Sequence, residues 1–248
     1  MAQLRRTRRQ PRHRPAELLG RRDRAPGHRG ARALTRGATM QISILGAGNV
    51  GMALARALLR AGQPVTIGVP DPARYADAVA ALGPQATLTG NDEAAQRGEL
   101  VILAVPYTAA LAIAQARADW QGRVLVDATN PLAPGLAGLS LGTTTSGAEQ
   151  VAERARGARV VKAFNTTGAE NMADSCYPQG QPMMPVAGDD AAARQQVLAL
   201  ATMIGFDAVD MGPLSSARYL EPMAIVWIHL AVKQGQGRRF AFARIRRS

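Results

Sequence analysis

The sequence has few residues of the types that bind metals, form disulfides or exchange protons. Its 248 residues include one cysteine, Cys176, and three histidines, of which His13 and His28 lie near the N-terminus. A single thiol excludes an internal disulfide framework and a cysteine-based zinc or iron–sulfur site. Beyond residue 40 the only imidazole is His229, which excludes a histidine-rich metal site. We therefore expect no metal.

Long apolar runs are also missing. The longest, Pro222 to Val232, has about half of the ~20 residues that a bilayer span requires. A secretory signal needs an apolar stretch of about 7 to 15 residues, and the first 39 residues offer only Leu18-Leu19. Because one cysteine also fits a reducing compartment, we expect a cytoplasmic protein with no membrane partner.

Positive charge is concentrated at the two ends of the chain. The formal charge is +12, but residues 1–39 hold 12 Arg against two acids, and residues 233–248 hold six basic residues and no acid. The stretch between them has 12 basic and 16 acidic residues. The basic ends lack the interleaved aromatic residues and the attached fold that indicate nucleic-acid binding. We expect no nucleic-acid partner.

Composition and pattern divide the chain into three segments. Residues 1–39 have no hydrophobic periodicity and predict a disordered tail; an inert or over-extended N-terminus is favoured over a basic binding arm. From Met40 onward, apolar runs alternate with helical patterns, which predicts an α/β fold with a Rossmann-type, doubly wound parallel sheet. We expect a dinucleotide-binding domain over residues 40–165 and a smaller C-terminal α/β portion over residues 166–248.

A glycine-rich turn follows the first expected strand. Gln41 to Leu45 is a short β-rich run, and Gly46-Ala47-Gly48-Asn49-Val50-Gly51 follows it directly. In this motif Gly46 allows the tight turn, Gly48 lets the backbone approach a pyrophosphate, and Gly51 lets the following helix pack against the strand. The helix N-terminus attracts the phosphates. Between a strand and an amphipathic helix, this spacing predicts a dinucleotide site.

The residues after the second strand normally decide between NAD and NADP. Asp71 stands 20 residues after Gly51 and fits an acceptor for the ribose hydroxyls, whereas Arg74 fits a partner for the 2′-phosphate. Asp71 equally fits a helix N-cap with Pro72 at the first helical position. The pattern leaves both NADP and NAD as expected cofactors.

Two later strand ends are expected to line the cofactor groove, because ligands of open α/β sheets lie outside the carboxyl ends of the strands. The apolar run that ends at Val105-Pro106 is one, and the run that leads to Asn130 is the other. Residues 132–145 are rich in Gly, Pro and Thr and predict a mobile active-site edge. Ser146 and Glu149 form a capping box with a structural role.

General acids and bases are scarce in the rest of the chain. His229 lies in an apolar helical pattern and is expected to be a core or interface residue, and Lys162 is expected to point to solvent from the apolar run 158–164. Cys176 has no basic neighbour that would activate its thiol. This scarcity fits hydride transfer to a flavin-like acceptor, because such a ring takes hydride directly and the protein mainly supplies orientation.

Several motifs, taken in order, resemble those of the NADP-dependent reductases of the deazaflavin coenzyme F-420 and their bacterial relatives. They are GAGNVG, VILAVP, DATNPL, KAFNT, PVAGDD and GPL-SSARYLEP, and they cover the chain from Met40 onward. The oxidoreductase domain of the STEAP metalloreductases is similar too. The resemblance implies hydride transfer between NAD(P)H and a deazaflavin or flavin, bound in a cleft between a Rossmann domain and a smaller C-terminal portion.

The resemblance also implies residue roles. The pyrophosphate would contact Gly46, Ala47, Asn49 and Val50, with Val105 and Pro106 along the cofactor. The nicotinamide end would lie near Asn130 and Asn165, the candidate catalytic residues. The substrate pocket would include Phe164, Asn165, Thr166, Leu214 and Arg218. The family commonly has a Ser/Thr-Arg pair after the second strand, whereas this chain has Val69-Pro70, so NADP preference depends on Arg74.

Two other functions fit parts of the pattern. An NAD(P)-binding sensor or scaffold without turnover needs the glycines alone. A small imine or carbonyl reductase shares the N-terminal motif, but its all-helical C-terminal domain does not match the strands expected after residue 158. The expected partner is a small molecule, and the pattern allows a homodimer through the C-terminal helix. The basic segment 233–248 is expected to be a solvated end that packs its apolar side; attraction for an anionic cofactor tail is the alternative.

Overall fold

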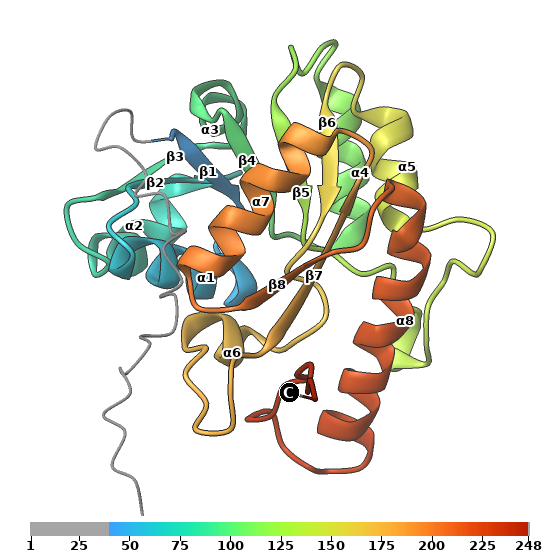
Figure 1. The fold of residues 1–248 in the computed structure, drawn as a ribbon. Helices are drawn as coiled ribbons and strands as arrows, with labels where there is room; N and C mark the ends of the chain where they lie inside the picture. The colour runs from blue at the N-terminus through green and yellow to red at the C-terminus, as the bar shows by residue number, and fades with distance from the viewer. Residues whose placement is uncertain (1–39, 248) are drawn as a thin grey trace, which may run out of the picture. The chain divides into compact units, whose positions relative to one another are not determined.

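The structure is a computed structural model that describes residues 40–247 (Figure 1). The tail expected over residues 1–39 lies outside the described residues. The strands are β1 (Ile42–Leu45), β2 (Val65–Val69), β3 (Ala86–Gly90), β4 (Leu100–Leu103), β5 (Val124–Asp127), β6 (Arg159–Lys162), β7 (Met183–Gly188) and β8 (Asp207–Asp210). The helices are α1 (Asn49–Arg60), α2 (Ala76–Ala80), α3 (Asn91–Arg97), α4 (Tyr107–Ala116), α5 (Gly147–Arg154), α6 (Ala169–Ala173), α7 (Ala191–Met203) and α8 (Ala217–Ile228). Four short helical turns are η1 (Pro72–Tyr75), η2 (Pro134–Leu136), η3 (Leu214–Ser216) and η4 (His229–Lys233).

The strands form one eight-stranded sheet in the order β3-β2-β1-β4-β5-β6-β7-β8. The first six strands are parallel to one another, β7 is antiparallel to β6, and β8 is parallel to β7. The expected Rossmann-type α/β fold is confirmed. Because β7 and β8 extend the same sheet, the sheet continues past residue 165, and the subdivision there stays a prediction.

Helices cover both faces of the sheet because the strands are apolar on both sides. Ile42 and Ile44 of β1 pack into a core with residues of α1, α6 and α7, whereas Val101 and Leu103 of β4 pack into a second core with residues of α3, α4 and α5. Figure 1 shows α7 lying across the near face of the sheet. With both faces covered, the strand ends and the loops that follow them are the places where the sheet can meet a ligand.

The strand register aligns the last residues of neighbouring strands in one row. Leu45 pairs with Gly68 on one side and with Leu103 on the other, Leu103 pairs with Asp127, and Asp127 pairs with Lys162. The segments that follow these residues therefore leave the sheet side by side. They include the glycine turn and the residues after β4, β5 and β6, and we call this row the carboxyl edge.

One element was predicted wrongly. The pattern at Pro185 to Asp190 predicts the start of a helix, but Met183–Gly188 is the buried strand β7, and α7 begins only at Ala191. The physical reason is the Asp190 side chain, which accepts a hydrogen bond from Ala193 N at 2.7 Å and so caps α7. The acidic pair thus marks the start of the helix after the strand. The sequence also predicts a short strand near Ala208, and the structure has β8 there, at Asp207–Asp210.

Candidate functional site

The glycine turn is closely packed on one side and open on the other. Gly46 has φ +112° and donates its N–H to Gly68 O at 2.8 Å. A Cβ added to Gly51 would lie 1.9 Å from Gly46 O, so the first turn of α1 sits directly on the strand end. A Cβ added to Gly48 would meet nothing within 4 Å, and Gly48 and Asn49 are exposed. The space before the N-terminus of α1 therefore fits a pyrophosphate.

The end of β4 adjoins this turn. A Cβ on Gly46 would lie 2.4 Å from Ala104 O and 2.8 Å from Val105 Cγ1. Pro106 follows and precedes α4. Val105 thus lies against Gly46 of the glycine turn, and Pro106 is the next residue along the chain.

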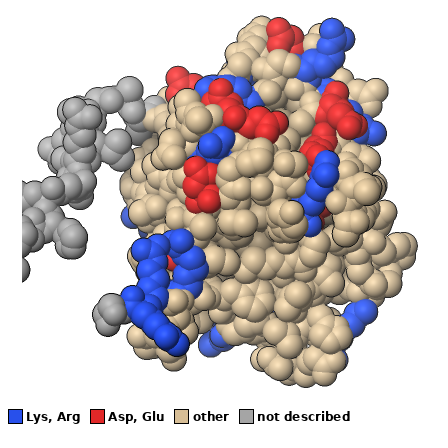
Figure 2. All heavy atoms as spheres, turned by 45° about the vertical axis from the view of Figure 1, so that its right-hand side comes forward, with Lys and Arg blue, Asp and Glu red and all other residues tan. Residues whose placement is uncertain are grey.

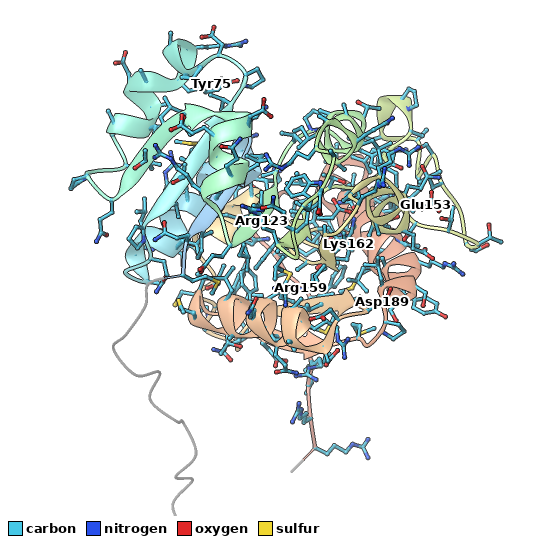
Figure 3. The ribbon with its side chains drawn as sticks, turned by 90° about the horizontal axis from the view of Figure 1, so that it is seen from above. Tyr75, Arg123, Glu153, Arg159, Lys162 and Asp189 are labelled. Carbon is cyan, nitrogen blue, oxygen red and sulfur yellow. The ribbon has the colours of Figure 1, made fainter. Side chains whose placement is uncertain are left out.

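The residues after β2 combine a helix cap with a free arginine. Asp71 Oδ1 accepts a hydrogen bond from Ala73 N at 3.2 Å and caps η1, with Pro72 at its first position, so the N-cap interpretation is confirmed. A contact between Asp71 and ribose stays a prediction. Arg74 is exposed, lies 5.7 Å from the centroid of the Tyr75 ring, and has no carboxylate within 4.0 Å among residues 40–247. Figure 3 shows Tyr75 at the outer rim of the molecule.

Asn130 and Asn165 exchange hydrogen bonds across the carboxyl edge. Asn130 Nδ2 donates to Asn165 O at 2.9 Å, and Asn165 Nδ2 donates to Asn130 Oδ1 at 2.9 Å and to Leu220 O at 3.1 Å. Two backbone carbonyls, which can only accept, fix the orientation of both amides. Asn130 Oδ1 thus has a partner, whereas the side-chain oxygen of the other residue, Asn165 Oδ1, is buried and has none in the described part of the chain.

Residues on both sides of Asn165 are also unusual. Phe164 is fully buried with φ +59°, a left-handed conformation that costs a residue other than glycine about 1–3 kcal/mol. Packing holds it there, because its N–H faces Met184 Sδ at 3.2 Å and its ring meets Phe206 edge-on. Thr166 is 2% exposed, and its hydroxyl has no partner among residues 40–247. Strain and unpaired polar atoms therefore coincide at the end of β6.

Lys162 is not solvated, and the prediction that it points to solvent is wrong. Its side chain is fully buried, and three oxygens surround its ammonium group: Thr129 O at 2.6 Å, Asp127 Oδ2 at 2.8 Å and Glu221 Oε1 at 2.9 Å. Figure 3 shows Lys162 in the interior, whereas Glu153 lies at the rim. The cause is the sheet register, which sets Lys162 directly opposite Asp127.

The two carboxylates of this cluster have further partners. Asp127 Oδ1 accepts from Thr129 N at 3.0 Å and from Thr129 Oγ1 at 2.7 Å. Glu221 Oε2 accepts from Gly147 N at 2.9 Å, and Oε1 accepts from Ala148 N at 3.2 Å, so Glu221 caps the N-terminus of α5. Burial opposes the charged form of Lys162, but Asp127 and Glu221 outweigh it and hold the pKa of the ammonium above its usual value.

The sequence pattern did not identify Asp127 or Glu221 as candidate site residues. One signal for Asp127 was present: β5 and β6 are neighbouring apolar strands, and each ends in a charged residue of opposite sign. An acid and a base at the ends of adjacent parallel strands indicate a buried pair. No comparable signal marks Glu221, because it lies on α8, 59 residues beyond Lys162.

The expected substrate-pocket residues on η3 and α8 have structural contacts. Leu214 is 4% exposed and lies in the second core. Arg218 donates to both carboxylate oxygens of Glu149, at 2.9 Å and 2.5 Å. Hydrogen bonds from Arg218, together with the Ser146 hydroxyl, hold the pKa of Glu149 below its usual value despite partial burial. Ser146 Oγ accepts from Glu149 N at 3.2 Å, which confirms the capping box.

The other groups that the sequence singled out are His229, Cys176 and the segment 132–145. His229 is exposed and contacts Gln234 at 3.0 Å, so it is not a core histidine. Cys176 is exposed in the loop before β7. The segment 132–145 contains η2 and a bridge between Leu132 and Leu139. In the described range no cluster of His, Cys, Asp and Glu could hold a metal, and no helix is long and apolar enough to cross a bilayer.

The C-terminal segment packs its apolar side, as expected. The Phe240 ring stacks on Trp227 with centroids 5.4 Å apart, while Arg238 pairs with Glu170 and Arg244 with Asp207. Attraction for an anionic cofactor tail stays a prediction.

Figure 2 shows a broad uncharged area on the side where α8 lies, and Val226 of this helix is 52% exposed. A homodimer through α8 also stays a prediction.

Gly48 lies at the open side of the glycine turn and Gly51 at the packed side, so alanine should affect binding at the first and stability at the second. Gly48→Ala should leave the melting temperature unchanged, because the new methyl group meets nothing within 4 Å, but should weaken NADPH binding about tenfold or more by filling the space before α1. Gly51→Ala should destabilise the fold by about 1–3 kcal/mol through its overlap with Gly46 O. Thermal unfolding and fluorescence titration measure both effects, and wild-type affinity in Gly48→Ala would contradict the assignment.

The Glu149–Arg218 pair predicts a pH-dependent contribution to stability. Because folding lowers the pKa of Glu149, its contribution is complete above the unfolded pKa of about 4.3 and is lost as the pH falls through the folded value. The deficit of Glu149→Gln in urea unfolding should thus be constant near neutral pH and shrink in acid. Glu153→Gln on the same helix is the control, and a deficit independent of pH would exclude the pair as its source.

Sequence and structure comparisons agree on one family. Residues 41–131 match the family model described as NADP oxidoreductase, coenzyme F420-dependent. The F420-dependent NADP reductase of Methanothermobacter marburgensis is 32% identical over 210 residues, which cover 78% of this chain and 93% of that protein. Metalloreductase STEAP3 of Rattus norvegicus is 32% identical over 189 residues, which cover 75% of this chain. The match spans only 36% of the length of that metalloreductase.

A solved structure extends the agreement to the fold. The crystal structure of a putative F420-dependent NADP reductase from Arthrobacter sp. FB24 superposes with a TM-score of 0.76 at 32% identity, and the match covers 84% of this chain and all of that one. The motifs at the carboxyl edge, the sheet order and these similarities lead to the same conclusion. The chain belongs to the family of F420-dependent NADP reductases and is an NAD(P)-dependent oxidoreductase.

Proposed function

We propose that this chain transfers a hydride between NADPH and a flavin-like acceptor, a deazaflavin or a flavin, at the carboxyl edge of the sheet. One observation carries the proposal. The register aligns Leu45, Leu103, Asp127 and Lys162 in one row. The open glycine turn and the Asn130–Asn165 pair therefore lie along the same edge, where a dinucleotide can reach from one to the other.

The residues present fit the two ends of such a cofactor. When bound, NADPH supplies the hydride from its nicotinamide ring. The N-terminus of α1 and the open space at Gly48 would hold the pyrophosphate. At the other end, Asn165 Oδ1 and Thr166 Oγ1 are buried without partners. An unpaired buried acceptor costs about 1–3 kcal/mol, so a ligand N–H at this end would offset that cost.

The protonation chemistry of this edge favours a flavin-like acceptor over an alcohol or ketone. Reduction of a carbonyl needs a positioned general acid, and Lys162 is already surrounded by three oxygens within 2.9 Å. The Tyr107 hydroxyl is the other candidate acid. It already donates its proton to Gln150 Oε1 at 3.1 Å, and burial raises its pKa, which makes it a weaker acid. A ring that takes hydride directly requires only orientation from the protein.

Turnover can be measured by the loss of NADPH absorbance at about 340 nm with the deazaflavin coenzyme, FMN or a ferric chelate as acceptor. The proposal predicts oxidation with at least one of the two ring acceptors, and a rate about tenfold or more lower in Asn165→Ala. Asn171→Ala removes a buried amide that donates to Phe240 O, and it serves as the control. Tight NADPH binding without oxidation by any acceptor would favour a sensor or scaffold.

Arg74 is proposed to supply the NADP preference that Val69-Pro70 does not. It is exposed and free of carboxylates in the described structure, at the end of the strand where the adenosine ribose would lie. Arg74→Gln should raise the Kd for NADPH about tenfold and leave the Kd for NADH unchanged, because only NADPH has the 2′-phosphate. Arg97→Gln, an exposed arginine paired with Glu93, is the control. Equal changes for both nucleotides would refute this role.

A further inference from the structure

We infer that Lys162 is a positioning residue that joins Asp127 and Glu221 into one buried tether and so sets the Asn130–Asn165 pair for hydride transfer. The inference rests on the proposed function. It begins with the capacity of the ammonium group, which has three N–H donors and no acceptor. Three oxygens at 2.6, 2.8 and 2.9 Å match that capacity. Lys162 therefore has no donor left for a ligand, and its fully buried side chain has no contact with solvent.

The tether connects four elements. Asp127 ends β5, Lys162 ends β6, Glu221 belongs to α8, and the Glu221 carboxylate caps α5 through Gly147 N and Ala148 N. The segment 132–145 begins shortly after the Thr129 carbonyl that Lys162 binds and ends just before the α5 cap. Both ends of that segment are thus held by the same three charged side chains.

Each asparagine of the pair is next to a tethered residue. Asn130 follows Thr129, whose N–H, hydroxyl and carbonyl all bond to the tether. Asn165 donates to the carbonyl of Leu220, the residue before Glu221. A shift of Lys162 would therefore act on both asparagines, on Asn130 through Thr129 and on Asn165 through Glu221 and Leu220. Misplacement by about 1 Å at a reacting centre can lower a rate about a hundredfold.

The charges determine which substitution can test this role. Two carboxylates and one ammonium give the cluster a net charge of −1, which faces the N-terminal N–H groups of α5. Lys162→Met alone leaves both carboxylates buried without a counter-charge and is expected to unfold the protein. The double variant Asp127→Asn/Lys162→Met keeps the net charge of −1 and the Glu221 cap, but it removes the bond to Thr129 O and the link to α8.

The test compares the folded double variant with the wild type in three measurements. Single-turnover hydride transfer to the deazaflavin coenzyme should fall about tenfold or more. The Kd for NADPH should rise much less than the rate falls, because the glycine turn, which would hold the pyrophosphate, shares no partner with the tether. Amide hydrogen exchange should speed up in residues 128–131 and 145–148 and stay unchanged in α1.

Arg194→Met is the matched control. It removes a largely buried arginine that pairs with Asp210 at 3.0 Å and donates to Gly188 O at 2.6 Å, away from the two asparagines. It should lower the melting temperature but leave the transfer rate and the exchange of residues 128–131 at wild-type values. This control separates a general loss of stability from a loss of positioning.

Two results would overturn the inference. A folded double variant with wild-type transfer rate would make the cluster purely structural, and a Kd for NADPH that rises as much as the rate falls would place its effect on nucleotide binding. If the wild type transfers no hydride to any acceptor, the proposed function fails. Hydrogen exchange then still decides whether Lys162 holds residues 128–131, so the two failures are distinguishable.

Discussion

A buried ammonium group needs counter-charge and an acceptor for each of its three N–H donors. Lys162 obtains both only because β5 and β6 pair in the register that sets it against Asp127, and because α8 brings Glu221 to the same point. Breaking such a cluster by removing one partner is strongly destabilising, whereas a cluster that is kept whole restricts the geometry around it. α5, α8 and the Thr129 backbone are joined to one another through this cluster, because each of them bonds to or contributes one of its members.

In the proposed function, the carboxyl edge would bind the cofactor through backbone groups at one end and through side chains at the other. At the glycine turn Gly51 packs closely against Gly46 and Ala104, and the first N–H groups of α1 have no partner within the helix. At the β5 and β6 ends, side-chain amides fixed by backbone carbonyls replace them. In the proposed function, the glycine turn holds the nucleotide and the two asparagines orient the reacting rings, so the protein acts mainly through orientation.

The parts of the site that sequence could predict are those with local causes. The glycine spacing, the Ser146–Glu149 capping box and the Asp71 cap each depend on residues within a few positions of one another, and each is present in the structure. The error at Lys162 concerns a contact between distant segments. Lys162 was expected in solvent because its partner Asp127 lies 35 residues away, and only the register joins them. The strand at Met183–Gly188, where a helix start was predicted, likewise forms through its pairing with β6, which the local apolar pattern does not encode.

In the proposed reaction, hydride passes directly from nicotinamide to a ring acceptor at the carboxyl edge. The most direct test uses NADPH that carries deuterium at both C4 positions, with the deazaflavin coenzyme as acceptor and mass spectrometry of the reduced coenzyme. Direct transfer predicts that the deuterium appears in the reduced deazaflavin, on carbon, where it does not exchange with water. Reduced deazaflavin without deuterium, or deuterium released to solvent, would contradict the account.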